Sequence, residues 1–243
     1  MPHPPYQGVI LAAGQGQRMG PLAERYPKAL LPVANVPLIV RHLQTLHQLG
    51  VRETFVVIGH LGDAIRKTLG DGTAHGMELH YVEQGARQGI AHAVASLEPH
   101  LDGPFILLLG DICFDFHHPE QALALMDQQD ADAVLAVKME VDADAVRRNF
   151  SVEMDDAGRV YRVVEKPVEP ATLCKGCGLY VFTPTLFDAI RRTPRSRLRN
   201  EYELTDAIQT LIDDGSPVYG ASIVDWDVNV TSPEDLIACS CHA

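Results

Sequence analysis

Apolar runs rich in Val, Ile and Leu alternate with helix-like segments through the first half of the chain, and this alternation constrains the fold more than any other feature. The runs end in Gly or Asp, as in GVILAAG at residues 8–14, ETFVVIG at 53–59 and FILLLGD at 105–111. Uninterrupted apolar strands of this kind suit a parallel sheet that helices cover on both faces. The first half therefore predicts an α/β fold, a Rossmann-like three-layer sandwich with a mostly parallel central sheet.

The pattern changes after about Val141. Residues 150–166, FSVEMDDAGRVYRVVEK, read as two alternating strands around an Asp-Asp-Ala-Gly turn, which predicts an antiparallel hairpin. A further strand is expected at 177–183 and helices at 184–193, 203–215 and 232–240, the last with Ser232 as its N-cap. We see no internal repeat and no low-complexity linker, so we expect residues 1–243 to form a single domain with a partly antiparallel second half.

Charge and hydropathy limit the classes of partner. The net charge of −12 argues against a nucleic-acid backbone as the main partner, because such binding needs a broad basic face. A small anionic ligand stays open if a few cations are focused on it. No apolar run approaches the roughly 20 residues of a membrane span, and the start MPHPPYQG does not look like a secretory signal. We expect a cytoplasmic protein that has no contact with membranes.

The five cysteines, an odd number, indicate reduced thiols. Cys174 and Cys177 form a CxxC pair, and Cys239 and Cys241 form a CxC pair before His242. Zinc binding or redox chemistry is the alternative. Ordinary thiols are favoured, because the first pair adjoins a strand pattern and the second lies near the terminus.

A glycine loop, ILAAGQGQRMG at residues 10–20, follows the first predicted strand. Glycines there bring backbone N–H groups close to a phosphate, although a purely structural turn is the alternative. The spacing of Gly14, Gly16 and Gly20 is GxGxxxG, which matches neither the dinucleotide fingerprint nor the P-loop. Arg18 in the loop and Lys28 after it place two cations within reach of one phosphate site.

Residues 11–39, LAAGQGQRMGPLAERYPKALLPVANVPLI, resemble the signature of the sugar-1-phosphate nucleotidylyltransferase family, LAAGxGTRM followed by PKxLLPV and a PLI helix start. The resemblance implies transfer of a nucleoside monophosphate from a nucleoside triphosphate, UTP or dTTP, to a sugar 1-phosphate, with Mg²⁺ as cofactor. It implies catalytic roles for Arg18 and Lys28. It also implies nucleotide contacts from the loop residues Leu11, Ala12, Ala13, Gly14 and Gly16.

The resemblance continues along nearly the whole chain and implies further site residues. YVEQGARQGIAHAV resembles the loop that reads a pyrimidine base, with Gln84 on the base edge and Gly89 approaching the ring. RVVEKP resembles the sugar-phosphate contact, with Glu165 toward sugar hydroxyls and Lys166 toward phosphate. The metal ligands implied are Asp111 in LLLGDICF and Asn229 in DWDVNV, with Asp227 as the alternative to Asn229.

The implied reaction is consistent with the residue types. A sugar 1-phosphate is already an anionic nucleophile, so the reaction needs charge neutralisation and in-line positioning rather than a general base. None of the eleven histidines has to be catalytic.

Departures from the family pattern leave the acceptor open. Ser151 stands where relatives have a glycine, and Gly176 where they have an asparagine that helps to hold an N-acetylated sugar, which weakens the case for N-acetylglucosamine 1-phosphate. Two other functions stay open: cytidylyl transfer to another phosphorylated alcohol, and a non-catalytic sugar-nucleotide-binding regulator.

The one basic run of this acidic chain spans residues 191–199, with arginines at 191, 192, 195, 197 and 199. We interpret it as a solvated loop after a helix, with a second anion site or a subunit contact as the alternative. A homo-oligomer stays open.

Overall fold

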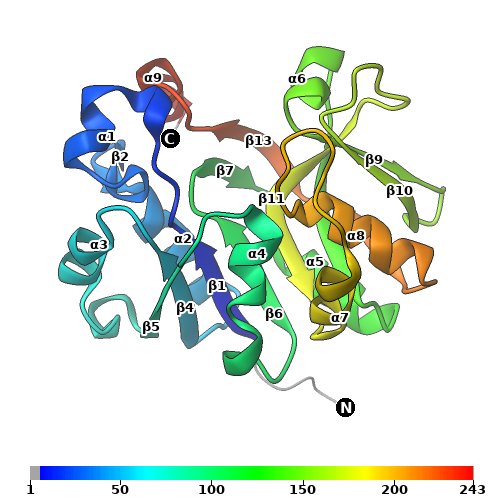
Figure 1. Cartoon of the computed structure of the whole chain (residues 1–243), viewed down its shortest axis with the longest axis horizontal. Coiled ribbons are helices and arrows are strands. Elements are labelled where there is room, and N and C mark those ends of the chain that lie inside the picture. Colours follow the sequence, from blue (N-terminus) through cyan, green and yellow to red (C-terminus); the bar gives the residue numbers. More distant parts are fainter. Residues whose placement is uncertain (1–5, 243) are drawn as a thin grey trace. The chain divides into compact units, whose positions relative to one another are not determined.

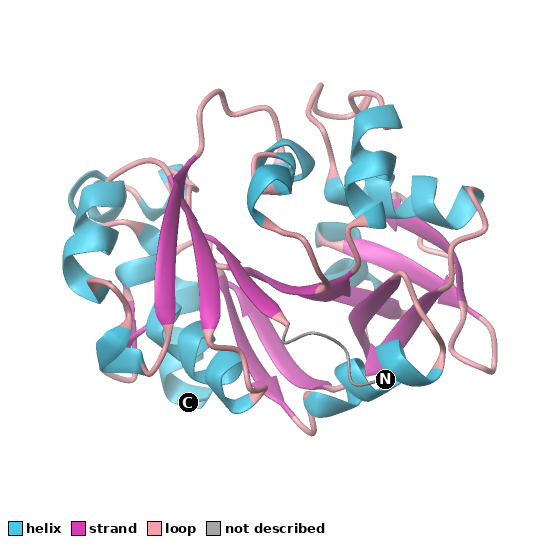
Figure 2. Cartoon of the chain, turned by 90° about the horizontal axis from the view of Figure 1, so that it is seen from below, coloured by secondary structure: helices cyan, strands magenta, loops and turns pink. Residues whose placement is uncertain are grey.

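A computed structural model describes residues 6–242 (Figure 1). The described chain divides into two compact units, both discontinuous in sequence. The amino-terminal unit contains described residues 6–86, 106–115 and 226–242, and the central unit contains residues 87–105 and 116–225. Figure 2 shows helices beside the strands in each unit.

The sheet of the amino-terminal unit follows from its apolar runs. Its strands lie in the order β6–β1–β4–β5, and β1 pairs with β4, and β4 with β5, in parallel. Val9 and Ile10 are fully buried in β1, because both faces of the strand are covered. The strand bounds are Gln7–Leu11 for β1, Glu53–Ile58 for β4, Glu78–Glu83 for β5 and Phe105–Leu109 for β6.

Helix α2 buries Leu38, Leu43 and Leu46 along one side, at the spacing of an amphipathic helix. A short hairpin lies before it, with Ala34 and Asn35 in its turn at positive φ. Strands β7 and β13 form a separate pair, of which residues 112–115 and 226–229 belong to this unit. The other elements are α1 (Pro21–Arg25), α2 (Leu38–Gln48), α3 (Gly62–Leu69), β2 (Pro32–Val33), β3 (Val36–Pro37), β7 (Ile112–Phe116), β13 (Val224–Asn229) and the 3-10 turns η1 (Gln17–Met19), η2 (Lys28–Leu30) and η3 (Thr73–His75).

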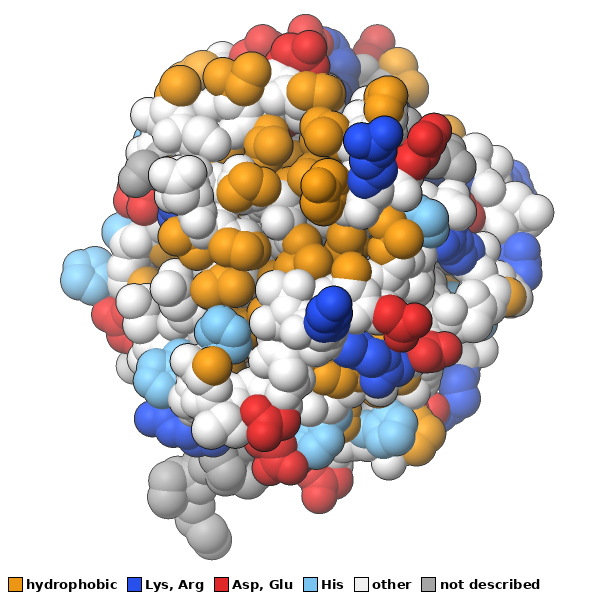
Figure 3. Space-filling view, turned by 90° about the vertical axis from the view of Figure 1, so that its left-hand side faces the viewer, with side chains coloured by type: hydrophobic (Ala, Val, Ile, Leu, Met, Phe, Trp, Pro, Cys, Tyr) orange, Lys and Arg blue, Asp and Glu red, His pale blue; other side chains and the backbone are white. Residues whose placement is uncertain are grey.

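The carboxy-terminal helix α9 (Pro233–His242) packs onto segments from the start of the chain. The Ser232 hydroxyl accepts the Asp235 N–H at 3.3 Å, as predicted for its N-cap. A buried cluster beneath α9 joins Met19, Ala23, Leu31, Val33, Leu38, Cys113, Val230 and Cys239. Ile237 of α9, Leu22 of α1 and Tyr26, which follows α1, remain exposed. Figure 3, which faces the side of Figure 1 that carries α1, shows hydrophobic side chains gathered there.

The strands of the central unit are partly antiparallel, as predicted for the second half. Their order is β10–β9–β11–β8–β12, with antiparallel pairs except between β8 and β12. In the predicted hairpin, the Asp155 carboxylate accepts the N–H groups of Ala157 and Arg159, both at 2.9 Å. The bounds are Ala133–Met139 for β8, Phe150–Met154 for β9, Val160–Glu165 for β10, Cys174–Phe182 for β11 and Val218–Ser222 for β12.

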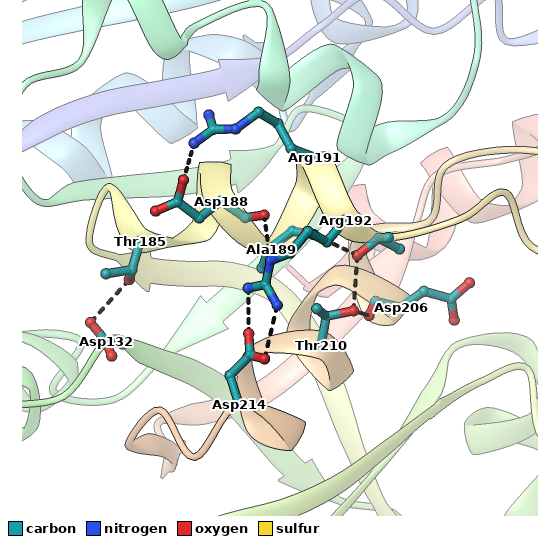
Figure 4. A network of polar contacts seen from close by, with 10 residues as sticks. Asp132, Thr185, Asp188, Ala189, Arg191, Arg192, Asp206, Thr210 and Asp214 are labelled. Atoms are coloured by element: carbon teal, nitrogen blue, oxygen red, sulfur yellow. Dashed lines mark hydrogen bonds and ion pairs between the residues drawn. The ribbon is translucent and has the colours of Figure 1, made fainter.

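Helices α7 and α8 of the central unit are joined by polar side chains (Figure 4). Arg192 of α7 donates to both carboxylate oxygens of Asp214, and the hydroxyls of Thr193 and Thr210 lie 2.9 Å apart. At the start of α7, the Thr185 hydroxyl donates to Asp132 at 3.0 Å. The helices are α4 (Ile90–Ala95), α5 (Glu120–Gln128), α6 (Ala143–Arg148), α7 (Thr185–Arg192) and α8 (Leu204–Asp213), with a 3-10 turn η4 (Glu98–His100).

These elements confirm the predicted α/β class with parallel strands first and antiparallel strands later. The single domain over residues 1–243 stays a prediction, since the described chain forms two units. Over residues 6–242, every helix is too short or too polar to cross a membrane.

Candidate active site

The glycine loop begins where β1 ends. Ala12 N–H donates to the carbonyl of Val57 at 2.8 Å, and the carbonyl of Leu11 accepts Gly110 N–H at 2.9 Å. These bonds hold the backbone of Leu11 to Ala13 between the ends of β4 and β6. The next residue, Gly14, is exposed, and a Cβ added there would meet no atom within 4 Å. The loop therefore exposes Gly14 at the strand ends, where ligands bind in sheets of this type.

Two glycines that the sequence analysis did not select make this close approach possible. A Cβ at Gly110 would lie 2.5 Å from the Leu11 carbonyl oxygen, and one at Gly59 would lie 3.0 Å from that of Ala13. The signal in the sequence is a glycine directly after an apolar strand, in VVIG and in LLLG. Larger residues would push β4 and β6 away from the loop.

Lys28 and Asp111 form an ion pair in this unit. Nζ of Lys28 lies 2.7 Å from Oδ2 of Asp111, and the two side chains are 9% and 41% exposed. Ala29 and Leu31 are buried next to Lys28 and fix the turn that carries it. The fold thus joins two predicted site residues that are 83 positions apart. Arg18 lies on η1 with an exposed side chain.

Asn229 lies at the end of β13, and its neighbour Val230 donates N–H to the Asp111 carbonyl at 2.8 Å. The backbones that carry the two implied metal ligands therefore meet. Asp227, the alternative ligand, is half-buried on the same strand. Carboxylate and amide oxygens fit Mg²⁺, which prefers hard oxygen ligands and keeps several from water or substrate. Within residues 6–242, no three His, Cys, Asp or Glu side chains gather as a metal site, so a cation at Asp111 would depend on such additional oxygens.

A buried histidine lies behind Asp111. Burial lowers the pKa of His42 to about 4, although the charge of Asp111 and a hydrogen bond with the Leu109 backbone oppose this shift. The ring is therefore neutral at pH 7 and ties α2 to the end of β6. No signal in the sequence distinguishes His42 from an ordinary helix residue.

The two residues implied for base recognition belong to different units. Gln84 follows β5, and its N–H donates to the carbonyl of Ile58 at 2.8 Å. Gly89 has φ of 113°, and a Cβ there would lie 2.4 Å from the carbonyl oxygen of Tyr202. Around it, Tyr202 N–H donates to Gln88 and Ala91 N–H donates to Tyr202. Gly89 is thus required by the backbone of residue 202, a constraint that the sequence pattern does not show.

Glu165 and Lys166 lie at the end of β10. Glu165 accepts hydrogen bonds from the Thr205 hydroxyl at 2.8 Å and from Arg199 at 3.2 Å. Burial raises the pKa of Glu165, and Thr205 and Arg199 oppose this shift. Lys166 has φ of 43°, held by its N–H bond to Asn149 at 2.8 Å. A non-glycine residue in this conformation is strained, and such strain is common at functional sites.

The two departures from the family pattern are buried in the sheet beside Glu165. Ser151 is 1% exposed and pairs with Val164 and Lys175. A Cβ at Gly176 would lie 1.8 Å from the Phe150 ring. An asparagine there cannot coexist with Phe150 in this position, because the ring fills the space.

The basic run is exposed, as expected for a solvated loop after a helix, and most of its arginines also have partners within the central unit. Arg191 pairs with Glu98 and Asp188, and Arg192 with Asp214. Arg195 donates to Gln88 at 2.6 Å and lies 4.9 Å from the centre of the Tyr202 ring. Arg199 pairs with Glu203 and Glu165. Thr205, Arg199 and Glu203 were not selected from the sequence.

All five cysteines carry reduced thiols. Cys174 and Cys177 are buried in β11, and burial raises the pKa of Cys174 to about 11, so its thiol is protonated at neutral pH. Cys113 packs with Cys239 of α9 in the buried cluster. These environments favour thiols that pack in the core.

Comparisons with known proteins identify the family of the chain. The sequence profile of a family described as nucleotidyl transferase matches residues 7–240. The chain is 34% identical over 229 residues to the UTP--glucose-1-phosphate uridylyltransferase AglF of Haloferax volcanii, which covers 94% of this chain and 93% of that protein. It is also 34% identical over 234 residues to the low-salt glycan biosynthesis nucleotidyltransferase Agl11 of the same organism, covering 95% of this chain but only 64% of Agl11. A glucose-1-phosphate thymidylyltransferase of Streptomyces antibioticus is 30% identical over 243 residues, which cover 95% of this chain and 67% of that protein.

Solved structures have the same fold. A UDP-glucose pyrophosphorylase complexed with UDP-glucose matches with a TM-score of 0.84 at 23% identity, over 98% of both chains. A putative glucose-1-phosphate thymidylyltransferase from Bacillus anthracis matches with a TM-score of 0.85 at 24% identity, over 98% of this chain and 95% of that one.

Proposed function

Because the chain belongs to the nucleotidyl transferase family, we propose that it transfers a nucleoside monophosphate from UTP or dTTP to a sugar 1-phosphate. The products are a nucleoside diphosphate sugar and pyrophosphate. The observation that carries this proposal is the ion pair of Lys28 and Asp111 beside the glycine loop, where a Cβ on Gly16 would lie 3.5 Å from Cβ of Lys28.

In the proposed reaction, a phosphate oxygen of the sugar 1-phosphate attacks the α-phosphorus of the nucleoside triphosphate. A new phosphorus–oxygen bond forms as the bond between the α-phosphorus and the bridging oxygen of the β-phosphate breaks, and pyrophosphate leaves with the electron pair. The nucleophile is already an anion, so no protein base has to remove a proton. The main barriers are repulsion between the substrates and loss of in-line geometry.

The chain supplies cations and N–H donors for these needs. The backbone of residues 11–16 would bind the triphosphate, while Arg18 and Lys28 would offset its charge. Asp111 and Asn229 would hold Mg²⁺. Bound Mg²⁺ supplies charge neutralisation and Lewis acidity at the phosphates. When the triphosphate and Mg²⁺ bind, Lys28 would leave Asp111 for the α-phosphate. The Lys28 ammonium would then face a negative phosphate, and the Asp111 carboxylate would face the positive metal ion.

Gln84 would read the base edge and Gly89 would approach the ring, and Glu165 and Lys166 would bind the sugar phosphate. Glucose 1-phosphate is the first acceptor to test, because it appears in the names of the uridylyl and thymidylyl relatives. The burial of Ser151 and the contact between Gly176 and Phe150 argue for an acceptor without an N-acetyl group. We propose the cytoplasm as the place of the reaction and a homo-oligomer as the assembly to test.

A pyrophosphate-release assay tests the proposal. Five nucleoside triphosphates are combined with glucose 1-phosphate, N-acetylglucosamine 1-phosphate and phosphorylated alcohols, with and without Mg²⁺. We expect turnover with UTP or dTTP and glucose 1-phosphate. Preference for CTP and a phosphorylated alcohol would instead support cytidylyl transfer. Nucleotide binding without any turnover would support a regulatory protein.

A further inference from the structure

The connection between α7 and α8, residues 193–203, is anchored at its base. Thr193 and Thr210 are hydrogen-bonded, and Arg192 of α7 pairs with Asp214 beyond the end of α8 (Figure 4). A second anchor lies further along, where Tyr202 N–H donates to Gln88 at 2.7 Å. The connection is therefore held at both ends and cannot swing as a free loop.

Arg199 lies within this connection and is gripped by Glu203. Nε of Arg199 lies 2.7 Å from Oε1 of Glu203, and a terminal nitrogen of Arg199 lies 2.5 Å from Oε2. This is the two-point geometry that fixes a guanidinium in its plane. Glu203 is only 3% exposed, and it also accepts the Ser196 hydroxyl at 3.3 Å. A carboxylate this buried holds its partner far more firmly than a surface pair does.

The same terminal nitrogen of Arg199 reaches Glu165. It lies 3.2 Å from Oε1 of Glu165, while the Thr205 hydroxyl donates to Oε2 at 2.8 Å. Each oxygen of Glu165 thus has one donor, and the side chain is still 17% exposed. A carboxylate has about four acceptor positions, so two remain for further donors. Arg199 and Thr205 therefore orient the Glu165 carboxylate, and its two other acceptor positions are available to donors on a ligand.

We infer that Glu203 is a positioning residue that acts through Arg199 to aim the Glu165 carboxylate at hydroxyls of the acceptor sugar. The inference rests on the proposed function, since it assumes that Glu165 binds the acceptor. Glu203 does not touch the substrate in this scheme. Its carboxylate fixes Arg199, and Arg199 and Thr205 together fix the two oxygens of Glu165.

The variant Glu203→Gln tests this role, because it keeps the size of the side chain and removes the charge that grips Arg199. Steady-state kinetics are measured with each substrate varied in turn. We expect the KM for the sugar 1-phosphate to rise about 10- to 100-fold, the scale for a contact misplaced by about 1 Å. The KM for the nucleoside triphosphate should change less than about threefold, because Glu165 does not contact that substrate in this scheme. A similar rise in both KM values would overturn the inference.

Deoxy analogues of the acceptor distinguish positioning from a merely structural role. If Glu203 only stabilised the fold, its replacement would not change the discrimination between glucose 1-phosphate and these analogues. The parent and Glu165→Gln proteins are compared on glucose 1-phosphates that each lack one hydroxyl, to find the hydroxyl that Glu165 contacts. Glu203→Gln should reduce the discrimination against that one analogue at least fivefold, because a misaimed carboxylate gains little from the hydroxyl. Unchanged discrimination would overturn the inference.

Arg191→Met is the matched control, because it removes another arginine of α7 whose carboxylate partners are Glu98 and Asp188 rather than Glu165 or the anchors of the connection. Its acceptor KM should equal that of the parent. If Glu203→Gln does not fold, Thr205→Val removes one donor to Glu165 and should give the same acceptor-specific rise. A parent without turnover on any sugar 1-phosphate would refute the proposed function, and this inference with it. An active parent whose two variants show no acceptor-specific effect would refute the inference alone.

Discussion

Replacement of Lys28 by methionine is expected to tighten the binding of a divalent cation even though it slows the transfer. In the substrate-free protein the Lys28 ammonium contacts Asp111, the implied metal ligand. A metal ion that approaches Asp111 must therefore displace the Lys28 ammonium or bind close to its positive charge. Methionine has a similar length and carries no charge, so it removes this competitor while filling most of the buried space.

The distance sets the size of the effect. Nζ and Oδ2 are 2.7 Å apart, with side chains 9% and 41% exposed. Two unit charges at that distance attract by about 1.5 kcal/mol in water and about 6 kcal/mol at an effective dielectric constant of about 20. The exposure of Asp111 and the desolvation of Lys28 reduce the net value to about 1 to 2 kcal/mol. Since about 1.4 kcal/mol is a tenfold change, we expect the dissociation constant to fall about 5- to 30-fold.

The measurement is Mn²⁺ binding without nucleotide, followed through the electron paramagnetic resonance signal of the free ion. Lys67→Met is the control, because it removes one positive charge from an exposed position of α3 in the same unit. Asp111→Asn should abolish the site. Equal or weaker binding by Lys28→Met would refute the competition, and absence of binding by every protein would refute Asp111 as a metal ligand.

Three further predictions concern Asp111, Gly89 and Glu165. Asp111→Asn should lower turnover at least 100-fold and leave the melting temperature within a few degrees, since the amide still accepts a bond from Lys28; near-parent activity in the pyrophosphate assay would remove Asp111 from the site. Gly89→Ala should lower the free energy of unfolding in urea by about 2 to 5 kcal/mol, because it combines a strained positive φ with a clash against Tyr202. A loss below about 0.5 kcal/mol, the size of an ordinary surface substitution, would contradict the clash. Burial raises the pKa of Glu165 above its ordinary 4.5, so the folded chain takes up this proton more readily than the unfolded chain and loses stability as pH rises from 4.5 through the raised pKa. Glu165→Gln should therefore gain stability relative to the parent between pH 4 and pH 7 in urea unfolding, and a constant difference would contradict this sign.

The sequence predicts the parts of the molecule that depend on local pattern. Apolar runs identified β1, β4 and β6, and the turn after Met154 identified the hairpin, because burial on both faces and turn chemistry leave periodic signals. The family resemblance selected Lys28 and Asp111, yet their direct contact follows only from how the strands are ordered.

The rest depends on contacts between distant segments. Glu203 and Arg199 look like a surface pair four residues apart, and only the burial of Glu203 at 3% exposure makes the pair rigid. The need for Gly89 comes from the backbone of Tyr202, more than a hundred residues later in the chain. No periodicity in the sequence reports such contacts.

The discontinuity of the amino-terminal unit has a consequence for biosynthesis. Met19 and Leu31 pack against Val230 and Cys239, so the support of the glycine loop is assembled from two segments that are far apart in the chain. Contacts this far apart carry a large entropy of loop closure and form late. During translation the apolar side chains of Met19 and Leu31 therefore stay uncovered until α9 has been made, and the nascent chain is prone to aggregation in this interval.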